Sequence, residues 1–337
     1  MLKGKQGEKK MKLGIIGTNW ITGSFIDATE LSKAMRLTAV YSRTEEKAKQ
    51  FANRYGARET YTDVEEMAKS NSIDCVYIAS PNALHYEQAL LFLKHKKHVV
   101  CEKPIFSNTK ELREASRVAE ENGVYLFEAM RNIHMPNFYK LEESLNKVGR
   151  LRSAVLTYAK YSSRYDNVLN GEEPNIFSLD FSGGALVDLG VYPVAAAVSL
   201  FGKPESIVYS PVIIRTGVDG SGTLVLNYLD FTCTIICSKI TTSFVDSEIH
   251  GEKGTLSIDN MGSLSELAFT AIHTDEKRLI GTEQMEAAMF YEIEKFAEII
   301  QTNNRQEYES LLQLSHDVLE ITEEARRQNG IVYRSER

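Results

Sequence analysis

The chain has 337 residues, of which 43% are apolar and 25% are charged, and its formal net charge is −7. This length predicts about two domains, and the composition excludes collagen-like, coiled-coil and disordered proteins. A nucleic-acid surface needs clustered cations, so an acidic chain without a basic block argues against a nucleic-acid partner. The longest apolar stretch, 189–201, is too short to span a membrane and contains Pro193 and Ser199. We therefore expect neither nucleic acid nor membrane as a partner.

Residues 1–10 lack the apolar centre of a secretory signal, and we interpret them as a disordered start or a cloning remnant. The four cysteines form no CxxC pair and have no neighbouring histidine that would complete a zinc site; they are Cys75, Cys101, Cys233 and Cys237. Buried free thiols are typical of a reducing compartment, so we expect a cytoplasmic protein. The sequence shows no cluster of histidine and acidic ligands, so we expect no metal.

Residues 11–130 alternate short β-branched runs with amphipathic segments. This pattern predicts βαβ units around a parallel sheet that is covered on both faces. Asp63 and Asn108 stand at expected helix starts, each with a glutamate three residues later. The expected strands are 12–17, 37–42, 59–61, 73–79, 98–101 and 125–127, and the expected helices are 20–32, 45–55, 64–69, 83–95 and 109–122. We predict a doubly wound, dinucleotide-binding Rossmann domain here.

Residues 131–337 follow a different pattern, in which long strand-like runs succeed one another without helices between them. Such runs predict an α+β domain on an open, largely antiparallel sheet. The expected strands are 151–162, 205–216, 222–229, 231–240, 243–250 and 254–259, and the expected helices are 135–147, 184–201, 284–302 and 307–328. We assign substrate binding and oligomerisation to this domain.

The strands of the second domain contain adjacent apolar pairs, which point to opposite faces of a sheet. They are Ile213–Ile214, Val225–Leu226 and Ile235–Ile236. One face can pack on helices, and the other would remain as an exposed apolar patch that proteins generally cover with a partner. This predicts a homodimer or homotetramer that is formed through the sheet.

The first expected strand leads into the turn GIIGTNWIT at 14–22 and then into a helix. A dinucleotide fold binds pyrophosphate at this position, with backbone amides and the helix dipole. The three slots of the GxGxxG pattern hold Gly17, Asn19 and Thr22, and we expect Asn19 to make the tight turn because asparagine tolerates a left-handed backbone. The alternative is a strand–turn–helix without a ligand. The residues expected to bind pyrophosphate are Gly17, Thr18, Asn19, Trp20 and Ile21.

The second expected strand ends at Ser42 and Arg43, where an NAD-selective enzyme usually has an acid for the ribose. A hydroxyl and a guanidinium instead suit a 2′-phosphate, because arginine binds phosphate through two donors. The alternative is that Ser42 caps the next helix with Glu45 as its partner, while Arg43 is a solvated charge. We expect a preference for NADP, with NAD as the other cofactor.

Two further strand ends carry polar side chains at the edge of the sheet where ligands bind in α/β folds. Ser80, Pro81 and Asn82 follow the fourth strand, with His85 one turn later, and Glu102-Lys103-Pro104 follows the fifth. Two charges beside an apolar core must be paired or used. The proline fixes the backbone, and a cis bond there would aim the lysine.

The sequence resembles the glucose–fructose oxidoreductase / inositol dehydrogenase family (Gfo/Idh/MocA). The matching pieces are the glycine turn at 14–22, SPNALH at 80–85, HVVCEKPIFSN at 98–108, EAMRNIHMP at 128–136 and SGGALVDLGVYP at 182–193. They cover essentially the whole chain after residue 11, in the order and spacing of the family. The resemblance implies a Rossmann domain, a second domain that forms oligomers, and a nicotinamide-dependent oxidoreductase.

The resemblance also implies three catalytic residues. They are Lys103, from the EKP element beside the nicotinamide, and Asp188 and Tyr192, from the D-x-G-x-[H/Y] element of the second domain. The last position is histidine in inositol dehydrogenases and tyrosine in glucose–fructose oxidoreductase and dihydrodiol dehydrogenase. Asp188 and Tyr192 are four residues apart, so both would point from one helical face. The strand-end residues Glu102 and Arg131 complete the expected cofactor contacts.

The implied chemistry is the transfer of a hydride between a nicotinamide and a secondary alcohol or carbonyl of a sugar, cyclitol or dihydrodiol. An ammonium group favours a neighbouring phenolate, so Lys103 would lower the pKa of Tyr192. Whether Lys103 or Tyr192 moves the proton is open at this point. The alternatives are a non-catalytic dinucleotide-binding regulator and a redox-assisted glycosidase on the same fold.

Overall fold

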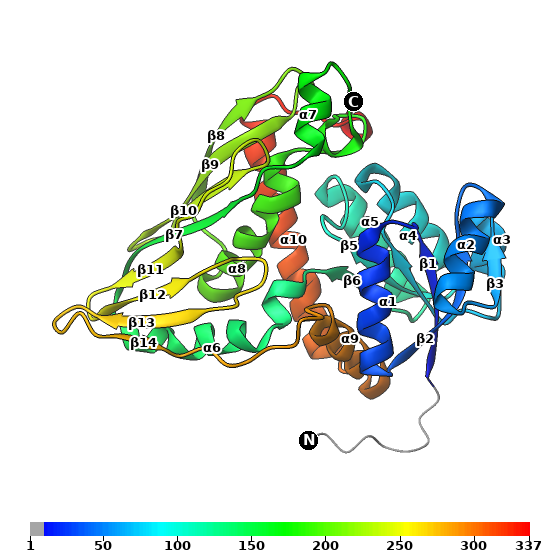
Figure 1. The fold of residues 1–337 in the computed structure, drawn as a ribbon, viewed down its shortest axis with the longest axis horizontal. Helices are drawn as coiled ribbons and strands as arrows, with labels where there is room; N and C mark the ends of the chain where they lie inside the picture. The colour runs from blue at the N-terminus through cyan, green and yellow to red at the C-terminus, as the bar shows by residue number, and fades with distance from the viewer. Residues whose placement is uncertain (1–9) are drawn as a thin grey trace.

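Two β-sheets organise the protein, one of six strands and one of eight, and helix α10 (Arg305–Arg327) runs between them (Figure 1). The structure is a computed structural model that describes residues 10–337. The expected disordered start therefore lies outside the described residues, apart from residue 10. Across 10–337, no helix has both the length and the apolar character that a membrane crossing requires.

The first sheet has the strand order β3-β2-β1-β4-β5-β6, and all of its paired strands are parallel. Its strands are β1 (Met11–Ile16), β2 (Met35–Tyr41), β3 (Glu59–Tyr61), β4 (Cys75–Ile78), β5 (His98–Glu102) and β6 (Leu126–Ala129). The strand order reverses between β1 and β4, and ligands bind at such a reversal in open α/β sheets. The predicted doubly wound domain is confirmed.

Helices cover both faces of this sheet, as the alternating pattern predicts. They are α1 (Trp20–Ser32), α2 (Glu45–Tyr55), α3 (Val64–Lys69), α4 (His85–Lys94) and α5 (Thr109–Glu121). Both expected caps are present. The Asp63 carboxylate accepts hydrogen bonds from the amides of Glu65 and Glu66, and the Asn108 side chain accepts one from the amide of Glu111.

The second sheet has the strand order β14-β13-β12-β11-β7-β10-β9-β8. Its strands are β7 (Leu151–Ala159), β8 (Ser206–Ile213), β9 (Asp219–Asn227), β10 (Thr232–Ser238), β11 (Ser247–Gly251), β12 (Gly254–Ile258), β13 (Leu267–Ala271) and β14 (Lys277–Leu279). β7 and β10 pair in parallel, and the other neighbouring pairs of this described sheet are antiparallel. This confirms the predicted open, largely antiparallel sheet.

The structure departs from the predicted elements at several points in this half. The expected strand 243–250 begins only at Ser247, and helix α7 (Arg164–Leu169) and strands β13 and β14 were not predicted. β14 is three exposed residues at the edge of the sheet, so it has no apolar alternation to reveal it. The expected helix 184–201 is a π-helical turn, Leu186–Gly190, followed by α8 (Val191–Phe201). The remaining helical segments are α6 (Pro136–Ser144), α9 (Phe290–Thr302) and the short turns Asn82–Leu84, Arg131–His134, Leu145–Val148, Asn175–Phe177 and Arg334–Glu336.

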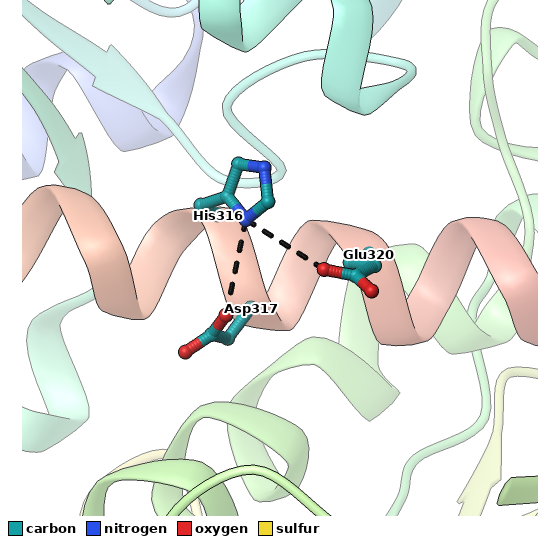
Figure 2. Close-up of side chains that lie close together, drawn as sticks. All are labelled: His316, Asp317 and Glu320. Atoms are coloured by element: carbon teal, nitrogen blue, oxygen red, sulfur yellow. Dashed lines mark ion pairs between the residues drawn. The ribbon is translucent and has the colours of Figure 1, made fainter. Parts of the chain in front are cut away.

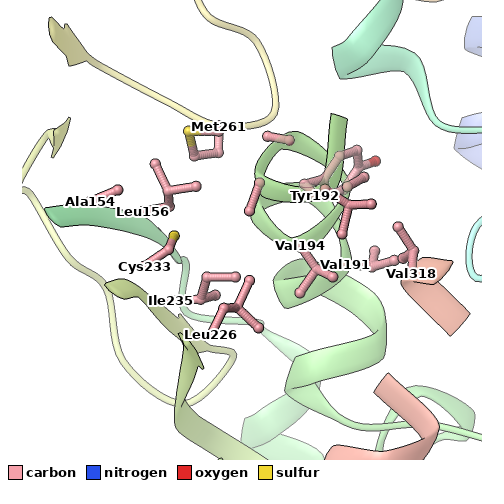
Figure 3. Packing of buried hydrophobic residues seen from close by; sticks show 14 of the residues in the cluster. Ala154, Leu156, Val191, Tyr192, Val194, Leu226, Cys233, Ile235, Met261 and Val318 are labelled. Atoms are coloured by element: carbon pink, nitrogen blue, oxygen red, sulfur yellow. The ribbon is translucent and has the colours of Figure 1, made fainter. Parts of the chain in front are cut away.

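Helix α8 packs on the inner face of the second sheet and forms the centre of its core (Figure 3). Val191 and Val194 of α8 belong to the same buried cluster as Leu226 and Ile235 of the sheet. The pair Ile235–Ile236 divides as expected, because Ile235 is fully buried whereas Ile236 is exposed. The outer face of the sheet therefore carries apolar side chains that this chain does not cover.

Helix α9 packs on the first sheet although it follows the second in the sequence. Ile293 and Phe296 are buried in the core that packs on the first sheet, and the Phe296 ring stacks on Phe127 with centroids 4.5 Å apart. The chain thus returns to its first half after building its second. The predicted division at residue 130 stays a prediction.

Candidate active site

Lys103 and Asp188 meet where the two halves of the chain face each other. Lys103 follows β5, and its Nζ lies 2.7 Å from both Asp188 Oδ1 and the Asp188 main-chain oxygen. The lysine side chain is 11% exposed and the aspartate side chain 28%. Since both remain accessible, the pair can bind a small molecule between the domains.

Buried carboxylates fix the backbone around Lys103. Glu102 accepts hydrogen bonds from the Tyr77 hydroxyl (2.6 Å) and from the Lys103 amide (3.2 Å), and Glu128 accepts one from the Ile105 amide (2.9 Å). The Lys103–Pro104 bond is cis. Burial raises the pKa of Glu102, and it raises the pKa of Glu128 to about 7. Both glutamates thus serve as supports for the lysine.

His85 connects the other strand end to the same turn. Its ring nitrogens lie 3.0 Å from the Pro104 oxygen and 2.9 Å from the Ser80 oxygen. Burial lowers its pKa, which favours the neutral ring. Pro81 begins a short turn, the Ser80 hydroxyl donates to Gln88, and the Asn82 amide donates to the Ser182 oxygen across the domains. These expected cofactor residues do lie together, and their described contacts are structural.

Asp188 lies in the π-helical turn, and the surrounding glycines explain its position. A Cβ on Gly190 would lie only 3.1 Å from Cys237 Sγ, so glycine allows the turn to approach β10 closely. Buried Asp219 accepts a hydrogen bond from the Leu186 amide (2.7 Å) and so fixes the start of the turn. The D-x-G spacing thus places the carboxylate on the sheet, where it can face the first domain.

Lys239 also contacts Asp188, and our sequence analysis missed it. Its Nζ contacts Asp188 Oδ2, its side chain is only 3% exposed, and it faces the Phe177 ring at 5.3 Å. A signal was present, because Cys233, Ile235 and Cys237 alternate on the inner face of β10 and Lys239 continues that alternation. A lysine on a buried face indicates a paired or functional charge.

Tyr192 lies beside the pair with its ring between two cations. Lys103 Nζ is 5.1 Å and the Arg131 guanidinium 5.2 Å from the ring centroid. Arg131 also donates to the Gly262 oxygen (3.3 Å), so its described contacts are with the second domain. The expected lowering of the Tyr192 pKa is wrong. Burial raises that pKa despite the opposing effect of Lys103 and Arg131.

The phosphate loop between β1 and α1 needs its first glycine. Gly17 has φ +107°, and a Cβ there would lie 2.7 Å from the Ala79 main-chain oxygen. Asn19 does not make the tight turn as expected. Its φ is −92°, and it caps α1 by accepting from the Thr22 amide (3.1 Å) while donating to the Ala79 oxygen (3.0 Å). Gly17 takes the strained conformation instead.

The other residues of this loop differ in exposure. Thr18 and Ile21 are half-buried, and the Trp20 side chain is 78% exposed at the start of α1. An exposed indole at this position can close over a bound dinucleotide or remain in solvent. In the first turn of α1 the Thr22 amide is bound by Asn19, and the amides of Trp20 and Ile21 stay available to an anion, as the dinucleotide fold requires.

The end of β2 leaves Arg43 open to a ligand. Ser42 is buried, and its amide donates to the Tyr61 oxygen (3.1 Å). The alternative that Ser42 caps α2 is wrong, because Thr44 occupies the N-cap position. Arg43 is exposed, and among residues 10–337 it makes no hydrogen bond or ion pair through its side chain. Its guanidinium is therefore available to a phosphate.

A separate group of ligand-type side chains lies on α10 (Figure 2). His316 Nδ1 is 3.8 Å from Asp317 Oδ1 and 3.7 Å from Glu320 Oε2. Lys203 also binds Glu320 Oε2, at 2.7 Å, so this carboxylate already has a cation partner. The group does not include any residue of the Asp188 cluster, and the expectation of no metal stays a prediction.

Comparisons with known proteins agree with this geometry. The model of an oxidoreductase family with an NAD-binding Rossmann fold matches residues 11–130, and the GFO/IDH/MocA C-terminal domain matches 145–257. The chain belongs to this oxidoreductase family. It is 44% identical to scyllo-inositol 2-dehydrogenase (NADP(+)) IolU of Bacillus subtilis over 96% of this chain and 98% of that protein. It is 41% identical to the uncharacterized oxidoreductase YgjR of Escherichia coli, again over 96% and 98%.

A solved structure of this oxidoreductase fold is also similar. The 3-ketoreductase KijD10 of Actinomadura kijaniata, in complex with TDP-benzene and NADP, has a TM-score of 0.81 at 21% identity and covers 95% of this chain and 97% of its own. This likeness concerns the fold. The family membership makes the protein an NAD(P)-dependent oxidoreductase that acts on CH–OH groups.

The loop at 17–21 fits the dinucleotide that the family uses. Gly17 leaves the space beside Ala79 that a side chain would fill, and the first turn of α1 provides the amides of Trp20 and Ile21, which the Asn19 cap does not use. With Arg43 at the end of β2, the fold has one group for the pyrophosphate and one for the ribose end. These residues would hold the cofactor.

We expect Gly17→Ala to weaken cofactor binding at least about tenfold, because the added Cβ and the positive φ would together displace the loop. Fluorescence titration with NADPH measures this. Gly56→Ala is the control, since Gly56 also has a positive φ but has no atom within 4 Å of the added Cβ. Equal binding by wild type and Gly17→Ala would contradict the assignment of this loop.

Glu128 predicts a pH dependence of stability. Its pKa rises from 4.5 to about 7 on folding, so the folded state binds more protons between these values and stability is lost as the pH rises. Glu128→Gln removes this titration and keeps an acceptor for the Ile105 amide. The free energy of unfolding of the variant should gain on that of wild type by up to about 3 kcal/mol from pH 5 to pH 8. Urea unfolding at pH 5 and pH 8 measures the free energy of unfolding of both proteins. The same change in that free energy for wild type and Glu128→Gln between the two pH values would refute the prediction.

Proposed function

We propose that this protein is a dehydrogenase for a secondary alcohol of a cyclitol or sugar, with Lys103, Asp188 and Tyr192 as its catalytic residues and NADP as its preferred cofactor. The observation that carries the proposal is the contact of Lys103 with Asp188 between the two halves of the chain. Residues 103 and 188 come from different domains, so a ligand held by both lies between a cofactor domain and a substrate domain. The name of the B. subtilis relative supports a cyclitol and NADP.

The reaction removes a hydride from carbon and a proton from oxygen, and a bound nicotinamide supplies the hydride acceptor. Lys103 takes the proton of the hydroxyl in oxidation and returns it to the carbonyl oxygen in reduction. Asp188 orients Lys103 by accepting from its Nζ with a side-chain and a main-chain oxygen. The remaining exposure of Asp188 lets the same carboxylate accept a hydrogen bond from a second hydroxyl of a polyol.

Tyr192 has a different role from the one a free phenolate would have. Its raised pKa keeps the phenol protonated at neutral pH, so it can donate a hydrogen bond but is a poor base. Its ring meanwhile contacts the ammonium of Lys103. We therefore assign the proton transfer to Lys103 and the orientation of the substrate oxygen to Tyr192.

The experiment for this function is a panel of cyclitols and sugars assayed with NADP and NAD, for wild type and for Lys103→Met. Wild type should reduce the cofactor with at least one polyol. Lys103→Met should lower kcat by about 100-fold or more and still bind NADPH, because removing an acid–base or electrostatic group has this scale. Near-normal turnover by the variant would make the EKP segment structural. Cofactor binding without turnover of any polyol by wild type would favour the regulator.

Arg43 should set the choice of cofactor. Its guanidinium is free to bind a 2′-phosphate, and such a partly exposed contact contributes about 1–3 kcal/mol, or a preference of about 5- to 150-fold for NADP in kcat/KM. Arg43→Asp should erase or invert the preference, since the acid repels the phosphate and binds the ribose diol. The control is Arg54→Asp, which makes the same change of charge in the last turn of α2, the helix that follows Arg43. Strong NAD selectivity of wild type would refute the role of Arg43.

We propose that the outer face of the second sheet joins two copies of the chain. We also propose that the protein works in the cytoplasm, because its four cysteines are buried free thiols, which a reducing compartment favours. Val208 and Val212 of β8 and Ile236 of β10 are 38–55% exposed on this face. Light scattering should give a dimer or tetramer mass for wild type and a smaller mass for Ile236→Asp. A monomer mass for wild type at micromolar concentration would refute this proposal.

A further inference from the structure

The strongest unassigned feature is the second lysine on Asp188. A carboxylate has two oxygens, and here Oδ1 binds Lys103 while Oδ2 binds Lys239. One negative charge is thus shared by two ammonium groups in a largely buried site. A single pair would have satisfied Asp188, so the extra buried cation needs an explanation.

The position of Lys239 is rigid, because three elements hold it. It follows β10, the turn at 186–190 brings Asp188 to it, and the ring of Phe177 lies 5.3 Å from its Nζ. Its exposure of 3% leaves no route for it to contact a substrate as freely as Lys103 does. Lys239 therefore acts through Asp188.

The charge of Lys239 changes how the cluster handles a proton. When two cations share one carboxylate, each weakens the attraction between the carboxylate and the other cation. The two cations also repel each other. Burial, with the charges of Lys103 and Arg164, lowers the pKa of Lys239 to about 7. The Asp188 carboxylate contacts its Nζ, and an opposite charge in contact favours the charged form of a lysine.

We propose that Lys239 is a positioning residue for hydride transfer, which holds Asp188 in register and makes the proton of Lys103 easier to release. This inference rests on the proposed function. In oxidation the alcohol carbon loses a hydride to the oxidised nicotinamide, its oxygen loses a proton to neutral Lys103, and the carbonyl forms. An ammonium at Lys103 must lose its proton before each such turnover, and the second cation favours that loss.

Other charged and titratable groups also face this cluster, and they stay unchanged in the variants below. Those near Lys239 and Asp188 include Arg164 of α7, and those near Lys103 are Glu102, Glu128, His85, Arg131 and Tyr192. Lys239 is distinguished from them by its direct contact with Asp188.

The test compares Lys239→Met, Lys239→Gln and Lys239→Arg. In Lys239→Met and Lys239→Gln, the rising limb of the pH profile of kcat/KM for oxidation should move up by about one pH unit or more. The loss should be about tenfold at pH 7 and should be recovered at high pH. The loss should appear in kcat more than in KM. Lys239→Arg retains the charge and should keep the wild-type profile. Lys203→Met, which removes an exposed ion pair with Glu320, should change nothing.

A merely structural Lys239 would give another result. Activity would then fall at every pH without recovery, and Arg would not restore the profile; either finding would overturn the proposal. Lys239→Gln retains a polar contact with Asp188, so the test can still be made if Lys239→Met does not fold. Thermal melting and NADPH titration check the folding and cofactor binding of each variant.

A readout without turnover separates this inference from the proposed function. In cofactor-free protein with ¹³C-labelled lysine, the signal that is lost in Lys103→Met should titrate at a higher pH in Lys239→Gln than in wild type. An unchanged titration refutes the inference even if the enzyme is active. A shifted titration supports it even if no tested polyol is oxidised, which would count against the proposed substrate class alone.

Discussion

The shared carboxylate of Asp188 is the constraint around which the rest of the structure is arranged. It binds Lys103 of the first domain and Lys239 of the second, so it links the two sheets at the point where they face each other. Two buried carboxylates hold the backbone on either side of the Lys103–Asp188 contact. Glu102 accepts a hydrogen bond from the Lys103 amide, and Asp219 accepts one from the turn that carries Asp188. Without this support a lysine, which has four rotatable bonds, could not be held in one place.

Burial of acids is the cost of this arrangement. Glu292 of α9 is fully buried, its two oxygens have no hydrogen-bond partner among the described residues, and burial raises its pKa well above 4.5. Burial likewise raises the pKa of Glu128 to about 7 and the pKa of Asp219 to about 6. Of the buried acids, Glu102 and Glu128 are the two whose pKa is affected by the charge of Lys103, and a perturbed pKa beside a specific charge partner is typical of a functional site.

Much of the fold followed from periodicity, and the remainder depended on contacts between distant segments. Strand–helix alternation predicted the parallel sheet, and the EKP and D-x-G elements predicted Lys103 and Asp188. The π-helical turn was hidden, because its cause is the close packing of Gly190 on Cys237, which no local pattern records. Asn19 has the residue type for a tight turn but caps the helix instead, since Gly17 already supplies the positive φ. The sequence did contain a signal for Lys239, which is a charged residue on the buried face of a strand. Glu292 gives the same kind of signal, because it lies in the apolar stripe of Met289, Ile293 and Phe296.

The central claim is that hydride transfer takes place at Lys103 and Asp188, and a crystal structure with oxidised cofactor and a bound polyol tests it most directly. The account predicts a substrate hydroxyl about 3 Å from Lys103 Nζ, with the nicotinamide ring against the same carbon. A polyol bound elsewhere, with the nicotinamide away from Lys103 while the Lys103–Asp188–Lys239 contacts remain intact, would contradict it.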